Sequence, residues 1–419
     1  MSKLHGSKRA YLGSFFFAVA IAALAWALSS SCSRRLGPAN DVTAEGLPPA
    51  AGLSPDKPHV TPDHDVPGTP LFAEHALGAP LVIGNLTVFP VYARTQEDIG
   101  DVLSLDEALE KGLAEVREVG GSMGDPNSTQ GRRADGARVN TLEIENKGVL
   151  PILVLAGTIV KGGKQDRQIG QDFLVEAKKT EPVDAFCVEH GRWNAERDGA
   201  GTAGKFASAK VLAVGDVRAA GQYGNDQSRV WQKVAETNQK QGKSAPSDTL
   251  LATIDDPEVQ KRRADLSAKI VAHLRGAPQP ADVVGMAYGI SGKVRGVRTF
   301  MSHRIFQGYA EVLANTAALE SITAQAGGDS GGKPVDAAAV TAFVKAIESG
   351  SRTERDTPAA NANAYYDHDV GYGSMAVFKG APAAPKAPSS EASPASSASA
   401  SPAPTSTARK AITRDFLAK

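Results

Sequence analysis

The feature that most constrains the fold is an unbroken apolar run, "LPILVLAGTIV", at Leu150–Val160. A strand with one face in water alternates apolar and polar residues, whereas a strand covered on both faces is apolar throughout. The run therefore predicts a strand inside a layered core. Two further segments predict strands: "LTVFPVYA" (86–93) is extended in character, and in "TLEIEN" (141–146) Leu142 and Ile144 alternate with two glutamates.

Helix signals are concentrated in the second half of the chain. Asp256 and Pro257 form an N-cap with proline in the first turn, and apolar residues then keep helical spacing until Gly276. Similar patterns predict three more helices: an amphipathic helix over residues 305–319, a helix from Asp336 to Gly350, and, in the first half, a short helix from Ser104, with Glu107 three residues later, to Gly112.

These patterns predict the α+β class. The N-terminal part is expected to be strand-rich, with a mixed or antiparallel sheet, and helices are added in the C-terminal part, together with strands at 282–290 and 373–379. Strands and helices are partly segregated, which favours this class over a regular βαβ alternation. The folded body is expected at residues 71–380, between disordered flanks.

The N-terminus predicts export. Basic residues precede an apolar run from Leu12 to Leu28, which is typical of an export signal or membrane anchor in residues 1–32. Cys32 resembles the lipidated cysteine of a bacterial lipoprotein, although Ser29 stands where that pattern has leucine. We expect an extracytoplasmic protein of the bacterial cell envelope, tethered to the membrane by lipidated Cys32 or by an uncleaved N-terminal helix.

Two low-complexity segments flank the folded body. Residues 33–70 are rich in proline and predict an extended spacer. Residues 381–408 are almost entirely Ala, Pro, Ser and Thr and predict a disordered linker. The tail, 409–419, is expected to be either a short docking helix or a frayed end.

Composition argues against two classes of protein. The chain carries 46 basic and 46 acidic residues, so no nucleic-acid partner is expected. Its two cysteines, Cys32 and Cys187, are too few for a fold held by disulfides. Burial of apolar surface must therefore hold the core.

The loop "GTIVKGGKQDRQIG" (157–170) has glycines at the spacing of a phosphate-binding P-loop. Gly163, however, intervenes before Lys164, and the next residue, Gln165, carries no hydroxyl. The segment that follows is strand-like rather than helical, so the P-loop motif is absent.

The composition of this loop nevertheless suits an anion. Gly162 and Gly163 could expose backbone N–H groups in a nest. Lys161, Lys164 and Arg167 add positive charge. The alternative is a hairpin turn between two strands with solvated charges.

The segment "FCVEHGRW" places a cysteine beside a glutamate and a histidine. Successive side chains of a strand point to opposite faces, so Cys187 and Glu189 share a face that excludes His190. Cys187 is then either a small apolar filler or a nucleophile with a partner from elsewhere, such as His303 or His368.

Three smaller features complete the candidate sites. Arg192 and Trp193 lie in a predicted turn, where they either pack against the protein or bind a planar or anionic ligand.

Two Asp-His-Asp triplets occur in the sequence. The triplet at 63–65 lies in the spacer and is expected to bind nothing. The triplet that begins at Asp367 lies in a loop of the body and could bind metal or assist catalysis. The chain has neither H-E-x-x-H nor G-x-S-x-G. No metal is predicted, and the cofactor stays unknown.

An ordered series of segments resembles a known family. "NLTVFPV", "SLDEALEKGLAEVREV", "LEIENKG", "LPILVLAGTIVKGGKQDRQI", "FCVEHGRW" and "QSRVWQKVAE" together look like the ARPP-1 family, named for an ARG and rhodanese-phosphatase-superfamily-associated protein domain. The resemblance covers about residues 81–326. It implies a shared fold and a shared ligand-facing edge, and the name, which records genomic association, hints at a nucleotide or ADP-ribose.

One segment departs from the family pattern. Many members resemble "DGEELVGAKQNR" where this chain has "AGTIVKGGKQDR", so Thr158 and Ile159 replace an acidic pair. If those acids perform chemistry in other members, this chain lacks it. The positions that match are Gly157, Gly162, Lys164, Gln165, Arg167, Cys187, Glu189, Gly191, Arg192 and Trp193.

We therefore expect a membrane-tethered binding or accessory module that contacts a small anionic ligand resembling a nucleotide or ADP-ribose. The predicted ligand residues are Gly162, Gly163, Lys164, Gln165, Arg167, Arg192 and Trp193. One alternative is a hydrolase of phosphate- or ribose-containing substrates, with Glu189 as general base and Cys187 or Asp367 assisting. A further alternative is a structural envelope protein without a ligand.

Overall fold

The computed structural model describes residues 58–119, 141–192, 194, 196–197, 200–202, 204–329, 331–379 and 411–419. The predicted export segment, the linker at 381–408 and Trp193 lie outside these residues. All described residues belong to one unit of the chain, residues 52–419.

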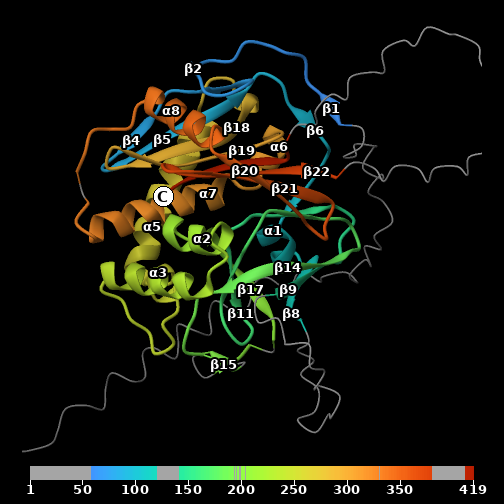
Figure 1. The fold of residues 1–419 in the computed structure, drawn as a ribbon, viewed down its shortest axis with the longest axis vertical. Helices are drawn as coiled ribbons and strands as arrows, with labels where there is room; N and C mark the ends of the chain where they lie inside the picture. The colour runs from blue at the N-terminus through green and yellow to red at the C-terminus, as the bar shows by residue number, and fades with distance from the viewer. Residues whose placement is uncertain are drawn as a thin grey trace, which may run out of the picture. The chain divides into compact units, whose positions relative to one another are not determined.

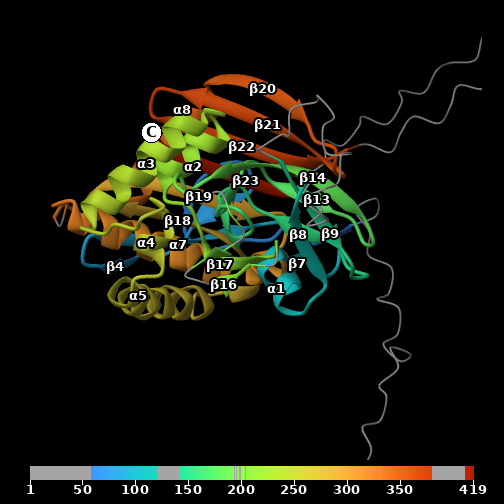
Figure 2. The same cartoon turned by 90° about the horizontal axis from the view of Figure 1, so that it is seen from below.

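A ten-stranded antiparallel sheet joins early and late parts of the described chain (Figure 1). Its strands, in spatial order, are β2 (Thr69–Pro70), β3 (His75–Leu77), β5 (Leu86–Ala93), β18 (Val283–Ile290), β19 (Lys293–Phe300), β23 (Thr413–Ala418), β22 (Gly371–Phe378), β21 (Asn361–His368) and β20 (Ser351–Asp356), and β4 (Leu81–Ile83) pairs with β5. Figure 2 shows β20 to β23 side by side.

A second, six-stranded antiparallel sheet holds the loop singled out in the sequence. Its order is β17 (Phe206–Leu212), β11 (Thr158–Gly162), β12 (Arg167–Ile169), β14 (Thr180–Cys187), β9 (Thr141–Asn146) and β8 (Ala114–Glu118). A mixed three-stranded sheet has the order β13 (Phe173–Val175), β10 (Ile152–Val154) and β7 (Leu103–Ser104). Two further sheets have two strands each. They pair β1 (His59–Val60) with β6 (Glu97–Asp98) and β15 (Glu196–Arg197) with β16 (Ala200–Gly201). The α+β class with antiparallel and mixed sheets is confirmed.

The helices of the described chain are α1 (Leu105–Glu110), α2 (Gly215–Gln222), α3 (Gln227–Lys240), α4 (Leu251–Ile254), α5 (Pro257–Arg275), α6 (His303–Gln307), α7 (Ala310–Ala326) and α8 (Ala337–Glu348), with a 3-10 turn at Pro280–Asp282. The predicted N-caps are confirmed: the side chains of Ser104, Asp256 and Asp336 each accept a hydrogen bond from a backbone N–H of the first turn. No helix among residues 58–379 and 411–419 that the structure describes is long and apolar enough to cross a membrane.

The apolar run at Leu150–Val160 forms two strands rather than one. β10 and β11 belong to different sheets, and the chain turns between them at Gly157, whose φ of +87° favours glycine. A side chain there would also meet Arg218 at 2.5 Å. The prediction of burial holds, because residues 152–160 are buried throughout.

The predicted amphipathic helix at 305–319 is also divided. α6 ends at Gln307, the chain turns at Gly308 and Tyr309, and α7 begins at Ala310. α7 is buried nearly all round because it packs against α5 as well as against β18 of one sheet and β17 of the other (Figure 1). The expectation of one solvated face was therefore wrong.

Both ends of the predicted body also differ from expectation. The tail is neither a helix nor a frayed end, because residues 413–418 form β23 inside the ten-stranded sheet. At the other end, the last residues of the predicted spacer, Thr69 and Pro70, pair with β3. The tail could not be predicted as a strand because one of its partners, β19, is distant in sequence, whereas β2 is a two-residue strand too short for a sequence pattern.

Candidate functional site

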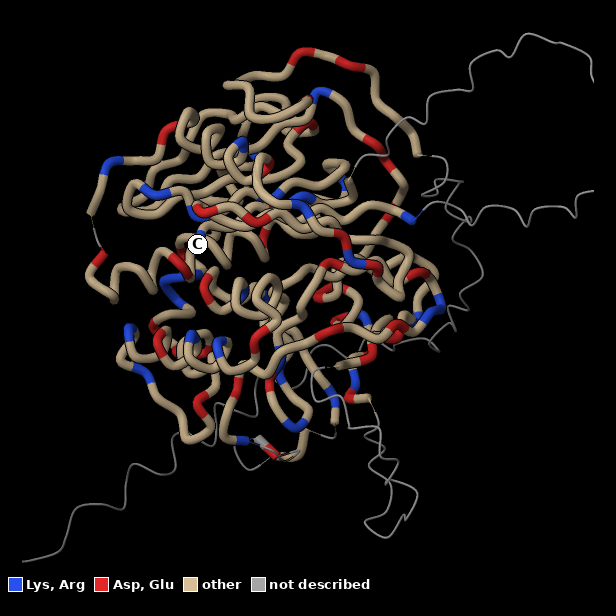
Figure 3. Tube along the Cα trace, viewed as in Figure 1, with Lys and Arg blue, Asp and Glu red and all other residues tan. Residues whose placement is uncertain are grey.

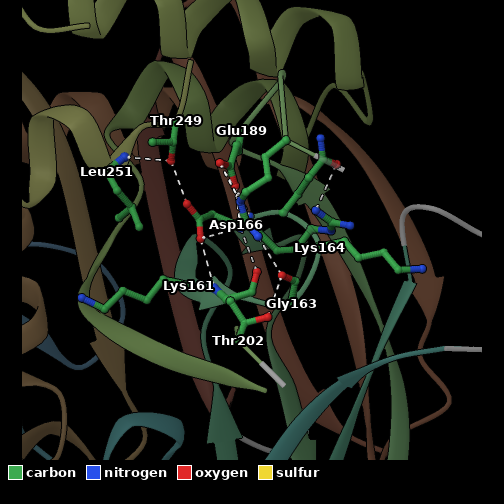
Figure 4. A network of polar contacts seen from close by, with 12 residues as sticks. Lys161, Gly163, Lys164, Asp166, Glu189, Thr202, Thr249 and Leu251 are labelled. Carbon is green, nitrogen blue, oxygen red and sulfur yellow. Dashed lines mark hydrogen bonds and ion pairs between the residues drawn. The ribbon is translucent and has the colours of Figure 1, made fainter. Parts of the chain in front are cut away.

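The loop between β11 and β12 is a tight hairpin whose two glycines are required. Gly162 and Gly163 have φ values of +136° and +47°. A Cβ at Gly162 would lie 2.1 Å from the carbonyl oxygen of Lys205, and one at Gly163 would lie 2.2 Å from the Phe206 ring. The hairpin alternative considered for this sequence is therefore the observed structure (Figure 4).

The backbone N–H groups of the hairpin are satisfied within the protein. The N–H of Gly162 donates to Asp166 Oδ1 at 3.0 Å, and that of Gly163 to the carbonyl oxygen of Lys205 at 3.1 Å. The N–H of Lys164 donates to Glu118 Oε1 at 2.9 Å. The chain itself thus supplies the acceptors that an anion would have to provide in the predicted nest.

The cations of the hairpin are paired as well. Lys164 Nζ and Arg167 Nη2 each lie 3.8 Å from the carboxylate of Glu118, and Lys161 Nζ lies 3.5 Å from Asp255. Arg167 is 2% exposed. The loop thus presents little uncompensated positive charge to an anion.

Asp166, which the sequence reasoning passed over, is the centre of the hairpin. Its side chain is fully buried and accepts hydrogen bonds from the Gly162 N–H and, at 2.7 Å, from the hydroxyl of Thr249. Its own N–H donates to Glu189 Oε2 at 2.9 Å. Asp166 therefore ties the hairpin to the two segments that follow β14 and α3. The available signal was an acidic residue inside a turn otherwise rich in cations.

Arg192 holds the other side of this network. Its Nε and Nη2 donate to the two oxygens of Glu189 at 3.0 and 2.8 Å. The remaining N–H groups donate to the carbonyl oxygens of Gly162, Gly163 and Asn194. A guanidinium has five N–H donors, and all five are used. The expectation that Arg192 binds an anionic ligand conflicts with this saturation.

The surroundings of Glu189 favour its ionised form, the carboxylate. Burial alone would raise its pKa, but hydrogen bonds from Arg192, Ser247 and the Asp166 N–H outweigh burial and lower the pKa below its ordinary value. Together these donors fill the lone pairs of both oxygens. Such a group is a weak base, and the general-base role considered for Glu189 conflicts with its surroundings.

Cys187 lies buried at the end of β14, opposite Arg167 of β12. Burial raises the pKa of its thiol, so the thiol stays protonated near neutral pH. The two histidines considered as partners hydrogen-bond elsewhere: His303 contacts the carbonyl oxygen of Val283, and His368 accepts from the N–H of Val370. These features favour the apolar-filler interpretation.

A cleft of about 660 Å³ opens beside the buried network. We call it the ligand cleft. Its walls come from the turn after β14 and from the segment that leads through α4 into α5. The lining residues are Glu189, Gly191, Arg192, Asn194, Glu196, Ala245, Pro246, Ser247, Thr249, Leu251, Ala252, Asp255 and Asp256. Backbone bonds from His190 and Gly191 to the carbonyl oxygen of Ser247 hold the two walls together.

The other predicted residues have different surroundings. Gln165 is buried and accepts a hydrogen bond from Arg167 at 3.3 Å, and Trp193 lies outside the described residues. Asp367 lies at the end of β21 in the other sheet, where it pairs with Lys419 at 2.7 Å. Within the described ranges, no cluster of histidine, cysteine or acidic side chains could hold a metal ion.

Fold and site together define an α+β domain with a buried ion-pair network at the floor of a cleft. The family model of the ARG and Rhodanese-Phosphatase-superfamily-associated Protein domain, ARPP-1, matches residues 74–384. The chain therefore belongs to the ARPP-1 family. Comparisons with curated proteins and with solved structures give no match.

Proposed function

We propose that this protein is a binding module whose ligand occupies the ligand cleft. The observation that carries the proposal is the cleft itself, about 660 Å³ in volume, with the rigid pair of Glu189 and Arg192 at its floor. Small-molecule sites usually have volumes of roughly 300–1,000 Å³ and are formed before the ligand arrives. A network with every donor and acceptor satisfied provides that preorganisation.

The lining favours a ligand that donates hydrogen bonds. Glu196 and Asp255 place carboxylates in the wall, and Ser247 adds a hydroxyl group. Asp256 and Thr249 also line the cleft, but Asp256 caps α5 and pairs with Lys243, and the Thr249 hydroxyl donates to Asp166. A carboxylate accepts hydrogen bonds from sugar hydroxyl groups, as it does from ribose in dinucleotide sites. We therefore propose a hydroxyl-rich ligand, such as a ribose or another sugar. In an ADP-ribose-like ligand, the ribose rather than the phosphates would enter the cleft.

Charge and pKa favour binding over hydrolysis. The lowered pKa of Glu189 and the protonated thiol of Cys187 remove the base and the nucleophile that the hydrolase alternative requires. Acidic and basic residues are interspersed along the described chain, which gives no broad surface of one sign for a polymeric anion (Figure 3).

The tether is proposed from the sequence. The apolar run at residues 12–28 and Cys32 support an extracytoplasmic module held at the membrane. Mass spectrometry of the mature N-terminus tests this proposal. A lipidated Cys32 or a retained apolar run is expected, and a mature chain that begins beyond Cys32 would contradict the tether.

A thermal-shift screen of the full chain tests the binding proposal. The compounds are ribose, other monosaccharides, ADP-ribose, NAD and inorganic phosphate. A ligand at 100 times its Kd stabilises the fold by about 2.7 kcal/mol, which raises Tm visibly. The variant Ala252→Trp fills the ligand cleft from α4 without removing a hydrogen-bonding side chain.

Ala338→Trp, at an exposed position of α8, is the matched control. A Tm increase that persists in this control and disappears in Ala252→Trp supports the cleft. An equal increase in both variants would place the ligand elsewhere. No increase with any compound would favour the structural alternative.

A further inference from the structure

The C-terminal strand fills a gap in the middle of the ten-stranded sheet. β23 lies between β19 and β22 and is antiparallel to both. Without it, β19 and β22 would each present an open edge, with unpaired backbone groups facing one another. The sheet is therefore complete only when this last segment of the chain is docked.

The side chains of the gap recognise a particular sequence. Asp415 is 1% exposed and accepts hydrogen bonds from Arg298 Nε at 3.2 Å and from the hydroxyl of Tyr223 at 3.2 Å, while Arg218 lies 3.4 Å away. On the opposite face, the next residue, Phe416, is buried in an apolar cluster. A strand that lacked the carboxylate would leave the buried guanidinium of Arg218 without its counter-ion and that of Arg298 with Asp172 alone.

The connection to this strand is far longer than its position requires. The N–H of Ile412 donates to the carbonyl oxygen of Ala376 at 2.7 Å, so β23 begins beside the end of β22. Neighbouring antiparallel strands need a turn of about two to five residues. Here residues 380–410 intervene. A chain of about thirty residues can reach about 100 Å, twice the width of roughly 50 Å expected for a domain of this size.

We propose that β23 is exchanged between two copies of this chain, each docking its last strand into the other's sheet. The partner is a second copy because the gap selects the Asp-Phe sequence that every copy carries at 415–416. The strand contacts are the same in the exchanged and unexchanged forms, so chain connection and concentration decide between them. The effective concentration of a chain's own strand, at the position between β19 and β22, falls about twentyfold when the connection lengthens from about four to about thirty residues.

An interchain disulfide tests the exchange. Met375 on β22 and Arg414 on β23 face each other, and both are half-buried. One full-length copy carries Met375→Cys and one tag, and a co-expressed copy carries Arg414→Cys and a second tag. A disulfide that joins the two tags is expected after oxidation. This disulfide should be absent when the copy with the second tag keeps Arg414. It should also be absent when residues 380–410 of both copies are replaced by the two-residue turn Asn-Gly.

Two results would overturn the proposal. In the first, a single chain with both cysteines closes its own disulfide while the mixed copies form none, which shows that each strand stays in its own chain. In the second, the link between copies persists with the Asn-Gly turn, which shows that another interface brings the chains together.

Discussion

Arg192 and Glu189 form a two-point ion pair in which Nε and Nη2 of the guanidinium donate to the two carboxylate oxygens at 3.0 and 2.8 Å. Both side chains are largely buried at the floor of the ligand cleft. Replacing one partner of such a pair leaves a buried charge that the other partner no longer compensates.

The first prediction concerns Arg192→Lys. Lysine keeps the charge but has three donors in place of five, so it cannot hold Glu189 and the hairpin carbonyl groups together. We expect the free energy of unfolding to fall by about 2 kcal/mol or more, since each buried acceptor left without a donor costs about 1–3 kcal/mol. Denaturant unfolding measures it. The exposed pair of Lys111 and Glu107 provides a control, because Lys111→Ala should cost less than about 1 kcal/mol. A similarly small loss in Arg192→Lys would contradict the central role of the pair.

The second prediction concerns acid. The pKa values of Glu189 and Asp415 are lowered, because neighbouring arginines outweigh the effect of burial. The unfolded chain therefore binds these protons at higher pH than the folded chain does. The stabilisation is complete above the ordinary carboxyl pKa of about 4 and is lost as pH falls through the lower folded values. Unfolding free energy measured from pH 7 to pH 3 should decrease below about pH 4.5. A constant value across that range would contradict the prediction.

The third prediction concerns the last nine residues, 411–419. Removing them exposes the edges of β19 and β22 and leaves Arg298 without Asp415, so the truncated chain should not reach the native fold. Circular dichroism and limited proteolysis measure the loss. Lys419→Ala, which removes an exposed pair with Asp367 and a contact with the Tyr372 ring, should cost no more than about 1 kcal/mol and change Tm little. A truncated chain with the Tm of the full chain would show that the strand is dispensable.

The fourth prediction concerns Cys187. Because burial raises the pKa of its thiol and shields it, iodoacetamide should label Cys187 slowly in the native protein at pH 7.5 and quickly after denaturation. Mass spectrometry of the labelled peptides gives both rates. Fast native labelling would restore the nucleophile interpretation.

Features set by neighbouring residues were predictable from the sequence. The caps at Ser104, Asp256 and Asp336 depend on contacts within one helical turn. Alternation located the strand at 141–146, and glycine content marked the hairpin after β11. In each case the local sequence and the final structure favour the same conformation.

Features set by distant contacts were not predictable. β23 is a polar and apolar hexapeptide whose conformation depends on strands far away in sequence. The anion site was inferred from the cations of one loop, but Glu118 and Asp255, which neutralise them, lie in β8 and at the end of α4. The sequence likewise could not show that all N–H donors of Arg192 are used within the protein, because those partners are set by the fold. Its residue type alone suggested a ligand contact.

The most direct test of the ligand cleft compares two variants by calorimetric titration with the compound that gives the largest Tm increase. Asp255 lines the cleft, whereas Lys164 lies on the hairpin outside it. We expect Asp255→Asn to weaken binding by about tenfold or more, since a hydrogen bond to a charged group contributes about 1.5–3 kcal/mol, and Lys164→Ala to leave Kd unchanged. The reverse result, with binding lost in Lys164→Ala and retained in Asp255→Asn, would contradict the cleft and return the ligand to the cations of the hairpin.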